Sequence, residues 1–84
     1  GFRCTAGDGA MVEGSVLIGD NIIGKGAKIK NVILDRHVEI APGFEIGYDR
    51  EKDQKLLENE KNSMIAISKN GIIVVPEGIR LGFD

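Results

Sequence analysis

Aliphatic residues recur every five or six positions through the first half of the chain, and this spacing limits the possible folds more than any other feature. The successive steps are six, five, six, five, six and six positions, and the row consists of Val12, Ile18, Ile23, Ile29, Leu34, Ile40 and Ile46. An amphipathic helix would repeat its apolar face about every 3.6 residues, and a strand would repeat it about every 2 residues. The spacing therefore fits neither element as the repeating unit.

A spacing of five or six residues is typical of the hexapeptide repeat of a parallel β-helix, in which each hexad forms one short side of a triangular coil. The leading aliphatic residue of each hexad would point into the lumen and stack on its equivalents in neighbouring coils. Glycine, Asn and Asp suit the corners, and the segments 19–21, 24–26 and 41–43 contain them. The charged residues expected to point outward are Lys25, Lys28, Lys30, Asp35, Glu39 and Glu45. The alternative is a small antiparallel β-meander with glycine turns, which would show longer alternating runs.

Composition argues against several functional classes. The chain has 84 residues, a formal net charge of −2 and a single cysteine, Cys4. The negative charge argues against binding to nucleic acid, and one cysteine cannot form an internal disulfide. No apolar run is long enough to cross a membrane and no signal peptide is visible, so we expect a cytoplasmic protein without membrane contact. We expect no cofactor and no metal site.

The chain divides into three segments within one domain. Residues 1–48 carry the hexapeptide coils. Residues 49–62 are highly charged, with opposite charges at helical spacing, which predicts a short surface helix or an ordered excursion. Residues 63–84 contain two apolar runs separated by Asn-Gly at 70–71, a strong hairpin signal. The predicted fold is therefore all-β: a short parallel β-helix with a charged excursion, and a C-terminal β-hairpin and tail that pack on it.

The number of repeats bears on assembly. Residues 6–47 hold about seven hexads, slightly more than two coils, because three hexads make one coil. The excursion and hairpin would cap the C-terminal end, whereas nothing comparable caps the N-terminal end. Open strand edges pair readily with another chain, so we expect a fragment of a larger protein or a homo-oligomer. The side chains expected at the contact are Phe2, Met11 and Val12 at the open end, with Ile79, Leu81 and Phe83 as a second surface.

Three stretches resemble a known family. Residues 31–47, which contain Asp35-Arg36 and end in Ile-Gly, resemble the closing coil of bacterial ADP-glucose pyrophosphorylase, also called glucose-1-phosphate adenylyltransferase. Residues 71–78, Gly-Ile-Ile-Val-Val-Pro-Glu-Gly, resemble a C-terminal strand of that family, and residues 4–16 resemble the start of the same domain. The resemblance implies a left-handed β-helix of the hexapeptide-repeat superfamily.

The resemblance also implies a function in glycogen or starch biosynthesis. In the family such a domain packs on a catalytic nucleotidyltransferase domain, mediates oligomer contacts and contributes basic residues to a site for phosphorylated effectors. Carried over by position, the candidate effector contacts are Arg36 and Lys55, because basic groups, and a guanidinium in particular, bind phosphate. The alternative for Arg36 is a salt bridge to Asp35 or to a carboxylate of a neighbouring coil.

The family's catalytic machinery is missing from this chain. The glycine-rich phosphate loop of the nucleotidyltransferase domain has no counterpart, because the short Gly7-Asp8-Gly9 stretch reads as a coil corner. We therefore expect no catalytic residue here, a regulatory and oligomerisation role, and a missing catalytic domain that would belong to a longer parent chain.

Two rival classes stay open. Some hexapeptide proteins are acyltransferases with a histidine as general base, and others hold zinc on three histidines, but the chain has one histidine, His37. We interpret His37 as a surface corner residue. The other rival is a structural module that self-associates and binds nothing small.

Overall fold

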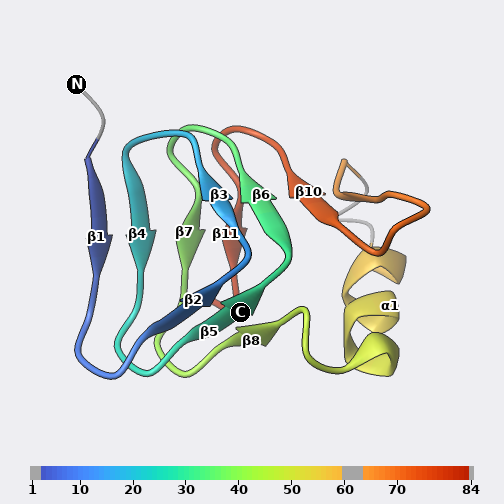
Figure 1. Ribbon diagram of the computed structural model, residues 1–84, viewed down its shortest axis with the longest axis horizontal. Helices are drawn as coiled ribbons and strands as arrows, with labels where there is room; N and C mark the ends of the chain where they lie inside the picture. Colours follow the sequence, from blue (N-terminus) through green and yellow to red (C-terminus); the bar gives the residue numbers. More distant parts are fainter. Residues whose placement is uncertain (1–2, 60–63, 84) are drawn as a thin grey trace.

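The computed structural model describes residues 3–59 and 64–83 of the chain (Figure 1). These residues form the strands β1 (Cys4–Ala6), β2 (Met11–Glu13), β3 (Val16–Leu17), β4 (Asn21–Ile23), β5 (Lys28–Lys30), β6 (Val32–Leu34), β7 (Glu39–Ile40), β8 (Glu45–Ile46), β9 (Ala66–Ile67), β10 (Ile73–Val75) and β11 (Arg80–Leu81), and the helix α1 (Arg50–Glu58). The strands are short, because each spans one side of a coil between two corners.

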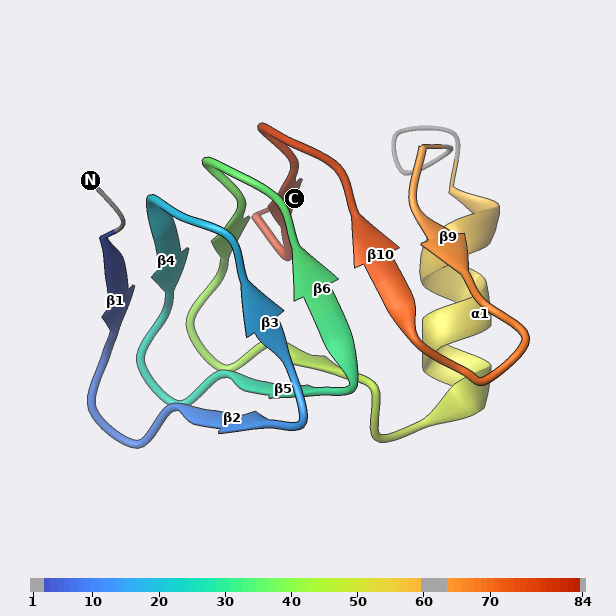
Figure 2. The same ribbon diagram turned by 45° about the horizontal axis from the view of Figure 1, so that its top comes forward.

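Three sheets form the sides of a triangular coil. Sheet 1 has the order β1-β4-β7-β11, sheet 2 has the order β2-β5-β8, and sheet 3 has the order β3-β6-β10-β9. Every pair is parallel except β9 with β10 among the residues that the structure describes. Figures 1 and 2 show the coils stacked from the N-terminal side toward α1, which lies beyond the last coil. The parallel β-helix predicted from the spacing is therefore confirmed.

The coil has a constant length in its first two turns. Equivalent residues in successive coils, such as Cys4 with Asn21 and Ser15 with Val32, lie seventeen positions apart. Glu39 and Arg80, which pair at the next coil, are separated by 41 positions, so the third coil is much longer. The extra length is an insertion that holds α1 and β9; it leaves the coil after β8 and returns to it at β10.

The centre of the core consists of three columns of side chains, one behind each sheet, and the buried Val32, Val38 and Ile73 extend it. The columns are Ala6, Ile23, Ile40 and Leu81; Val12, Ile29 and Ile46; and Leu17, Leu34 and Val75. Ile23, Ile29, Leu34, Ile40 and Ile46 are at most 1% exposed, as the spacing predicted.

Two members of the predicted core row differ from expectation. Val12 is 41% exposed, because it ends its column in the first coil and nothing in the described residues covers it. Ile18 is only half-buried, and Leu17 stands in the column above Leu34 in its place. Each of the first two coils is one position shorter than three full hexads, so one side must advance by five positions, which shifts the inward position by one.

Several residues with positive φ lie at the corners of the coil. Gly9, Gly26 and Gly43 have φ of 75°, 72° and 73° at the first corner, between sheets 1 and 2. Asp20 and His37 have φ of 53° and 58° at the third corner, between sheets 3 and 1. His37 is exposed there, which agrees with its interpretation as a corner residue.

The predicted hairpin is confirmed, and its second strand has a further partner. β9 and β10 pair antiparallel, as the Asn-Gly signal indicated, but β10 also pairs in parallel with β6. β10 is therefore the missing side of the third coil, and β11 begins a fourth coil by pairing with β7. Leu81, which we expected near a contact surface, is 1% exposed and belongs to the core.

The first coil is open. β1, β2 and β3 are the edge strands of their three sheets, and nearly all their residues are exposed. Met11 is 44% exposed at this end, whereas Phe2, another predicted contact residue, lies outside the described residues. The N-terminal end thus presents three strand edges and the top of the lumen.

Candidate functional site

Helix α1 begins with a regular N-cap. The Asp49 carboxylate accepts hydrogen bonds from the backbone N–H groups of Glu51 and Lys52, at 2.9 and 3.4 Å. Such a cap satisfies amide donors that have no partner within the helix. Lys52 and Lys55 are three positions apart and therefore lie on the same side of the helix.

Asp53 fastens α1 to the end of the third coil. Its side chain is 8% exposed, and its two carboxylate oxygens accept from the N–H of Gly47 at 3.1 and 3.2 Å. Gly47 has φ of +92°, and a Cβ atom there would lie 2.0 Å from the carbonyl oxygen of Lys30. Only glycine fits this position, so the chain can turn sharply out of the coil and present its N–H to Asp53.

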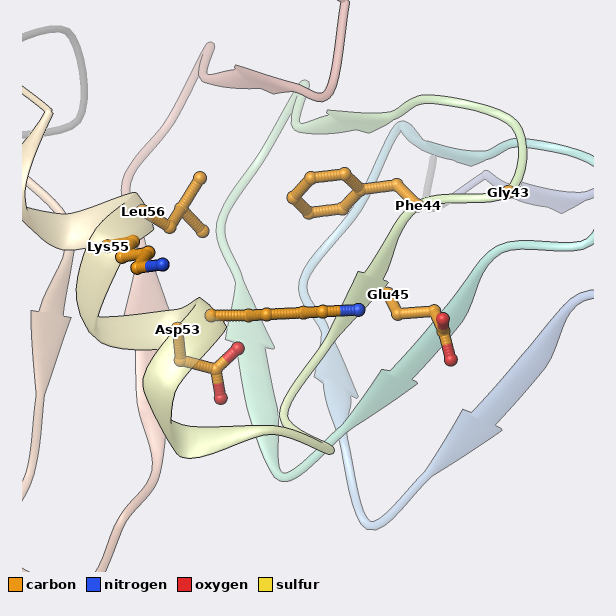
Figure 3. A pocket seen from close by; sticks show the side chains of 7 residues that line it. Gly43, Phe44, Glu45, Asp53, Lys55 and Leu56 are labelled. Carbon is orange, nitrogen blue, oxygen red and sulfur yellow. The ribbon is translucent and has the colours of Figure 1, made fainter.

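A cavity of about 400 Å³ lies between α1 and the first corner of the third coil. Its lining residues are Gly43, Phe44, Glu45, Lys52, Asp53, Lys55 and Leu56. Figure 3 shows Phe44 and Leu56 facing one another across the cavity, with Glu45 and Asp53 on the same side of them. Phe44 and Leu56 both pack against the core, so the apolar part of the cavity is continuous with the molecule's interior.

The charged side chains that line this cavity differ in whether they have an interaction partner. Within the described residues, the ammonium groups of Lys52 and Lys55 make no ion pair, and the carboxylate of Asp53 is engaged by Gly47. Glu45 is the remaining carboxylate of the lining, on the rim in β8. Two cations beside an apolar surface can bind an anion that carries a carbon skeleton.

The second sequence candidate, Arg36, lies elsewhere. It is exposed at the third corner, where its backbone carbonyl accepts from Gly78 N–H at 3.0 Å. The Asp35 carboxylate accepts from the backbone N–H of Arg36 at 2.7 Å, and within the described residues the Arg36 guanidinium forms no ion pair. The structure does not bring Arg36 and Lys55 together, because Arg36 lies at the third corner and Lys55 lies on α1.

Sequence reasoning missed Lys52 and Phe44. The spacing of Lys52 and Lys55 within a helical segment could have identified the second lysine. Phe44 had no such signal, because its position opposite α1 depends on how the insertion folds back.

The other candidate residues do not form a further site within the described part of the chain. The Cys4 thiol is exposed and donates to the side-chain oxygen of Asn21 at 3.6 Å. In residues 3–59 and 64–83 no three His, Cys, Asp or Glu side chains gather as metal ligands would. In the same residues, no helix has the length and apolar character needed to span a membrane.

The comparisons with known proteins agree with this architecture. The family described as "GlmU-like, C-terminal hexapeptide" matches residues 1–75, and the chain belongs to this family of hexapeptide β-helix domains. No solved structure matches the chain significantly.

Curated relatives confirm the more specific resemblance. Glucose-1-phosphate adenylyltransferase 1 of Vibrio vulnificus (strain CMCP6) is 35% identical over 83 residues, which cover 99% of this chain and 18% of the enzyme. The enzyme of Photobacterium profundum is 36% identical with the same coverage. The enzyme of Corynebacterium diphtheriae is 38% identical over 66 residues, or 79% of this chain and 16% of the enzyme. The chain thus spans less than a fifth of the length of these relatives.

Proposed function

We propose that the chain is a left-handed β-helical domain that regulates and assembles a cytoplasmic glucose-1-phosphate adenylyltransferase in glycogen biosynthesis. The similarity to such enzymes over 83 residues carries this proposal. The domain itself is non-catalytic, and the adenylyl transfer belongs to a nucleotidyltransferase domain that acts as its partner.

The α1 cavity is the proposed effector site. Lys52 and Lys55 would pair with the phosphate groups of a phosphorylated sugar, while Phe44 and Leu56 contact its carbon skeleton. Arg36 is proposed as a separate phosphate contact at the third corner, because it lies on a different part of the coil.

Calorimetric titration of the chain with a hexose bisphosphate tests the effector site. We expect Lys55→Gln and Lys52→Gln each to weaken binding by about tenfold, since each removes one charge-assisted contact. Lys69→Gln removes the same charge from an exposed turn outside the cavity and should leave the affinity unchanged. Equal affinity in all four proteins would exclude the α1 cavity, and a loss in Arg36→Gln alone would move the site to the third corner.

Catalysis is tested directly. The pure chain, mixed with ATP, glucose 1-phosphate and Mg²⁺, should form no ADP-glucose, because no segment of it resembles the phosphate-binding loop of the family's catalytic domain. Chromatographic detection of ADP-glucose above an enzyme-free blank would refute the assignment as a non-catalytic domain.

Assembly is proposed to use a second copy of the chain on the outer face of sheet 3. The outward side chains of its parallel strands are Val16, Ile33 and Val74, all apolar, with Val16 56% and Val74 38% exposed. Sheets 1 and 2 carry charges outward, such as Glu39 and Lys28, on the equivalent positions. Two copies with a net charge of −2 each can therefore approach through sheet 3 without facing like charges. A purely structural, self-associating module shares this face but would not bind the bisphosphate.

A further inference from the structure

Sheet 2 is one strand shorter than the other two sheets in the part of the chain that the structure describes. Sheets 1 and 3 each have four strands, whereas sheet 2 ends at β8. After β8 the chain leaves the coil at the second corner, between sheets 2 and 3, and forms α1, which lies beyond the last coil (Figures 1 and 2). The α1 cavity lies between this helix and residues 43–45, which lead into β8. The place of a further strand in sheet 2 is therefore beside the cavity.

The backbone of Glu45 faces away from the rest of sheet 2. The N–H of Lys28 donates to the carbonyl oxygen of Phe44 at 2.8 Å, and Lys28 lies opposite Glu45 in the parallel register. In a parallel ladder a residue bonds to the two neighbours of the residue opposite it, so Lys28 pairs with Phe44 and Ile46. The N–H and C=O of Glu45 consequently point to the side where α1 lies, and among the described residues they have no partner.

Asp53 replaces one hydrogen bond of the absent strand. The N–H of Gly47, which points out of the same edge as the backbone of Glu45, donates to the Asp53 carboxylate at 3.1 and 3.2 Å. In a continued sheet the carbonyl oxygen of a neighbouring strand would accept this hydrogen bond. The insertion thus satisfies the donor of Gly47 and leaves the N–H and C=O of Glu45 open.

The open groups of Glu45 match another polypeptide backbone. A peptide unit both donates and accepts, so it can pair with the N–H and the C=O of one residue at the same time. A phosphate dianion or a carboxylate has acceptors only and would leave the carbonyl oxygen without a donor. The edge of β8 therefore favours an extended peptide over a small anion.

The cavity has room for a short extended segment. Its volume is about 400 Å³, and Phe44 and Leu56 face one another across it (Figure 3). Successive side chains of a strand point to opposite faces. A segment paired with Glu45 would therefore place an apolar side chain between Phe44 and Leu56. Ile46 is buried at the end of its column, so the segment does not have to fill the core.

We propose that the edge of β8 binds an extended apolar peptide segment of a partner chain as a fourth strand of sheet 2. Hydrogen bonds to the N–H and C=O of Glu45 hold its backbone, and contacts with Phe44 and Leu56 select its side chain, as in other cases of strand addition. The proposal goes beyond the effector site and does not depend on it. Both ligands would use the α1 cavity, so they would exclude one another.

The uncharged peptide acetyl-Val-Thr-Val-amide is the probe, because its residues favour extended backbone and it offers the lysines no anion. It is titrated into the isotope-labelled chain and followed by two-dimensional nuclear magnetic resonance. The amide signals of Glu45 and Leu56 should shift with a dissociation constant on the order of 1 mM. Bound peptide should also slow the hydrogen exchange of the Glu45 N–H several-fold.

A second peptide separates backbone pairing from side-chain contact. The analogue that is methylated on each backbone nitrogen keeps the side chains but has no donor for the C=O of Glu45, and it should bind about tenfold more weakly. Equal binding of the two peptides, shifts confined to β1, β2 and β3, or no shifts at all would each overturn the proposal. The peptides contain no phosphate, so these outcomes do not depend on the effector proposal.

Two neighbouring leucines of α1 provide matched variants. Leu56 and Leu57 both pack against the core, but only Leu56 is among the residues that line the cavity. Leu56→Ala should weaken binding of the unmethylated peptide about tenfold, whereas Leu57→Ala should bind it as the parent chain does. Unchanged binding in Leu56→Ala, or equal losses in the two variants, would also overturn the proposal. The comparison of the two peptides uses the unaltered chain and decides the question even if a variant does not fold.

Discussion

Single residues in this fold are selected by backbone conformation as much as by side-chain chemistry. Gly26 and Gly47 both have positive φ, of 72° and 92°, but their surroundings differ. A Cβ atom at Gly26 would meet nothing within 4 Å, whereas one at Gly47 would collide with the Lys30 carbonyl at 2.0 Å. The two positions therefore separate conformational strain from steric exclusion.

Replacing these two glycines by alanine measures the difference. Gly26→Ala should lower the free energy of unfolding by about 1–2 kcal/mol, the cost of a left-handed conformation for an L-residue. Gly47→Ala should cost more than about 3 kcal/mol, since the chain must also move away from Lys30 and lose the hydrogen bond to Asp53. Urea unfolding of both variants provides the measurement. Equal losses would show that the close approach at Gly47 contributes nothing to stability.

Tyr48 gives the fold a titratable reporter. Desolvation comes first among the causes that raise its pKa, followed by the charge and hydrogen bond of Glu13 and the charge of Glu45. Because the folded pKa lies above the unfolded value, the protonated phenol stabilises the fold fully below the unfolded pKa of about 10. That contribution disappears as the pH rises through the folded pKa.

Glu13→Gln should move the pKa of Tyr48 back toward 10.0, because it removes the charge of Glu13 and the acceptor of its hydrogen bond. The chain has one tyrosine and no tryptophan, so the ultraviolet absorbance of the phenolate reports this group alone. Glu58→Gln, a distant change of the same kind at the C-terminal end of α1, serves as the control. A titration curve that does not move in Glu13→Gln would remove Glu13 from the explanation.

At the scale of elements, stability depends on where a side chain stands in its column. Val12 and Ile29 belong to the same column behind sheet 2, yet Val12 is 41% exposed and Ile29 is fully buried. Every interior position is covered on both sides by a neighbouring coil, while the first coil is covered on one side only.

Alanine substitutions along this column should lower the free energy of unfolding by very different amounts. Ile29→Ala should destabilise the fold by about 2–5 kcal/mol, the usual cost of truncating a buried aliphatic side chain. Val12→Ala should cost less than about 1 kcal/mol if the end of the column is exposed in solution. Urea unfolding of the two variants, compared with the parent chain, measures both losses. A large loss in Val12→Ala would show that another chain covers the open end.

The sequence predicted the columns and corners well, because coil stacking imposes a short local period. Ile23, Ile29, Leu34, Ile40 and Ile46 all lie in the core as expected. The coil is one position shorter than three full hexads, and for this reason Ile18 was assigned a position that Leu17 occupies.

The candidate site was less predictable from the sequence. Lys55 was identified through a family resemblance, but its neighbours Phe44 and Lys52 meet only because the insertion folds back along the third coil. Such a contact joins segments without a shared period. For the same reason the sequence predicts β10 as a hairpin strand but does not predict its second role as a side of the coil.

At the scale of the whole molecule, the two ends of the coil stack differ. The C-terminal end carries α1 and β9, whereas the N-terminal end presents the edges of β1, β2 and β3. The outer face of sheet 3 adds an apolar surface that runs across the coils, from Val16 to Val74. These features define two distinguishable contact surfaces for a second copy.

Light scattering over a wide dilution range should show an oligomer that dissociates on dilution. Val74→Lys places a charge at one end of the apolar face and should shift the mass toward the monomer if sheet 3 forms the contact. Ile22→Lys, on the outer face of sheet 1 in the interior strand β4, is the matched control and should leave the mass unchanged. A parent chain that stays monomeric and folded down to about micromolar concentration would contradict self-association through either surface.

The insertion between β8 and β10 shows that length at the second corner is free to vary. The strands before and after it keep the register of the uninterrupted coils, so the pairing of the coils does not depend on the length of the inserted segment. Such a corner tolerates insertions: a segment can be lengthened, exchanged or shortened there while the columns of core side chains stay intact. The segment inserted at this corner could therefore change, by evolution or by engineering, while the β-helix that supports it stays the same.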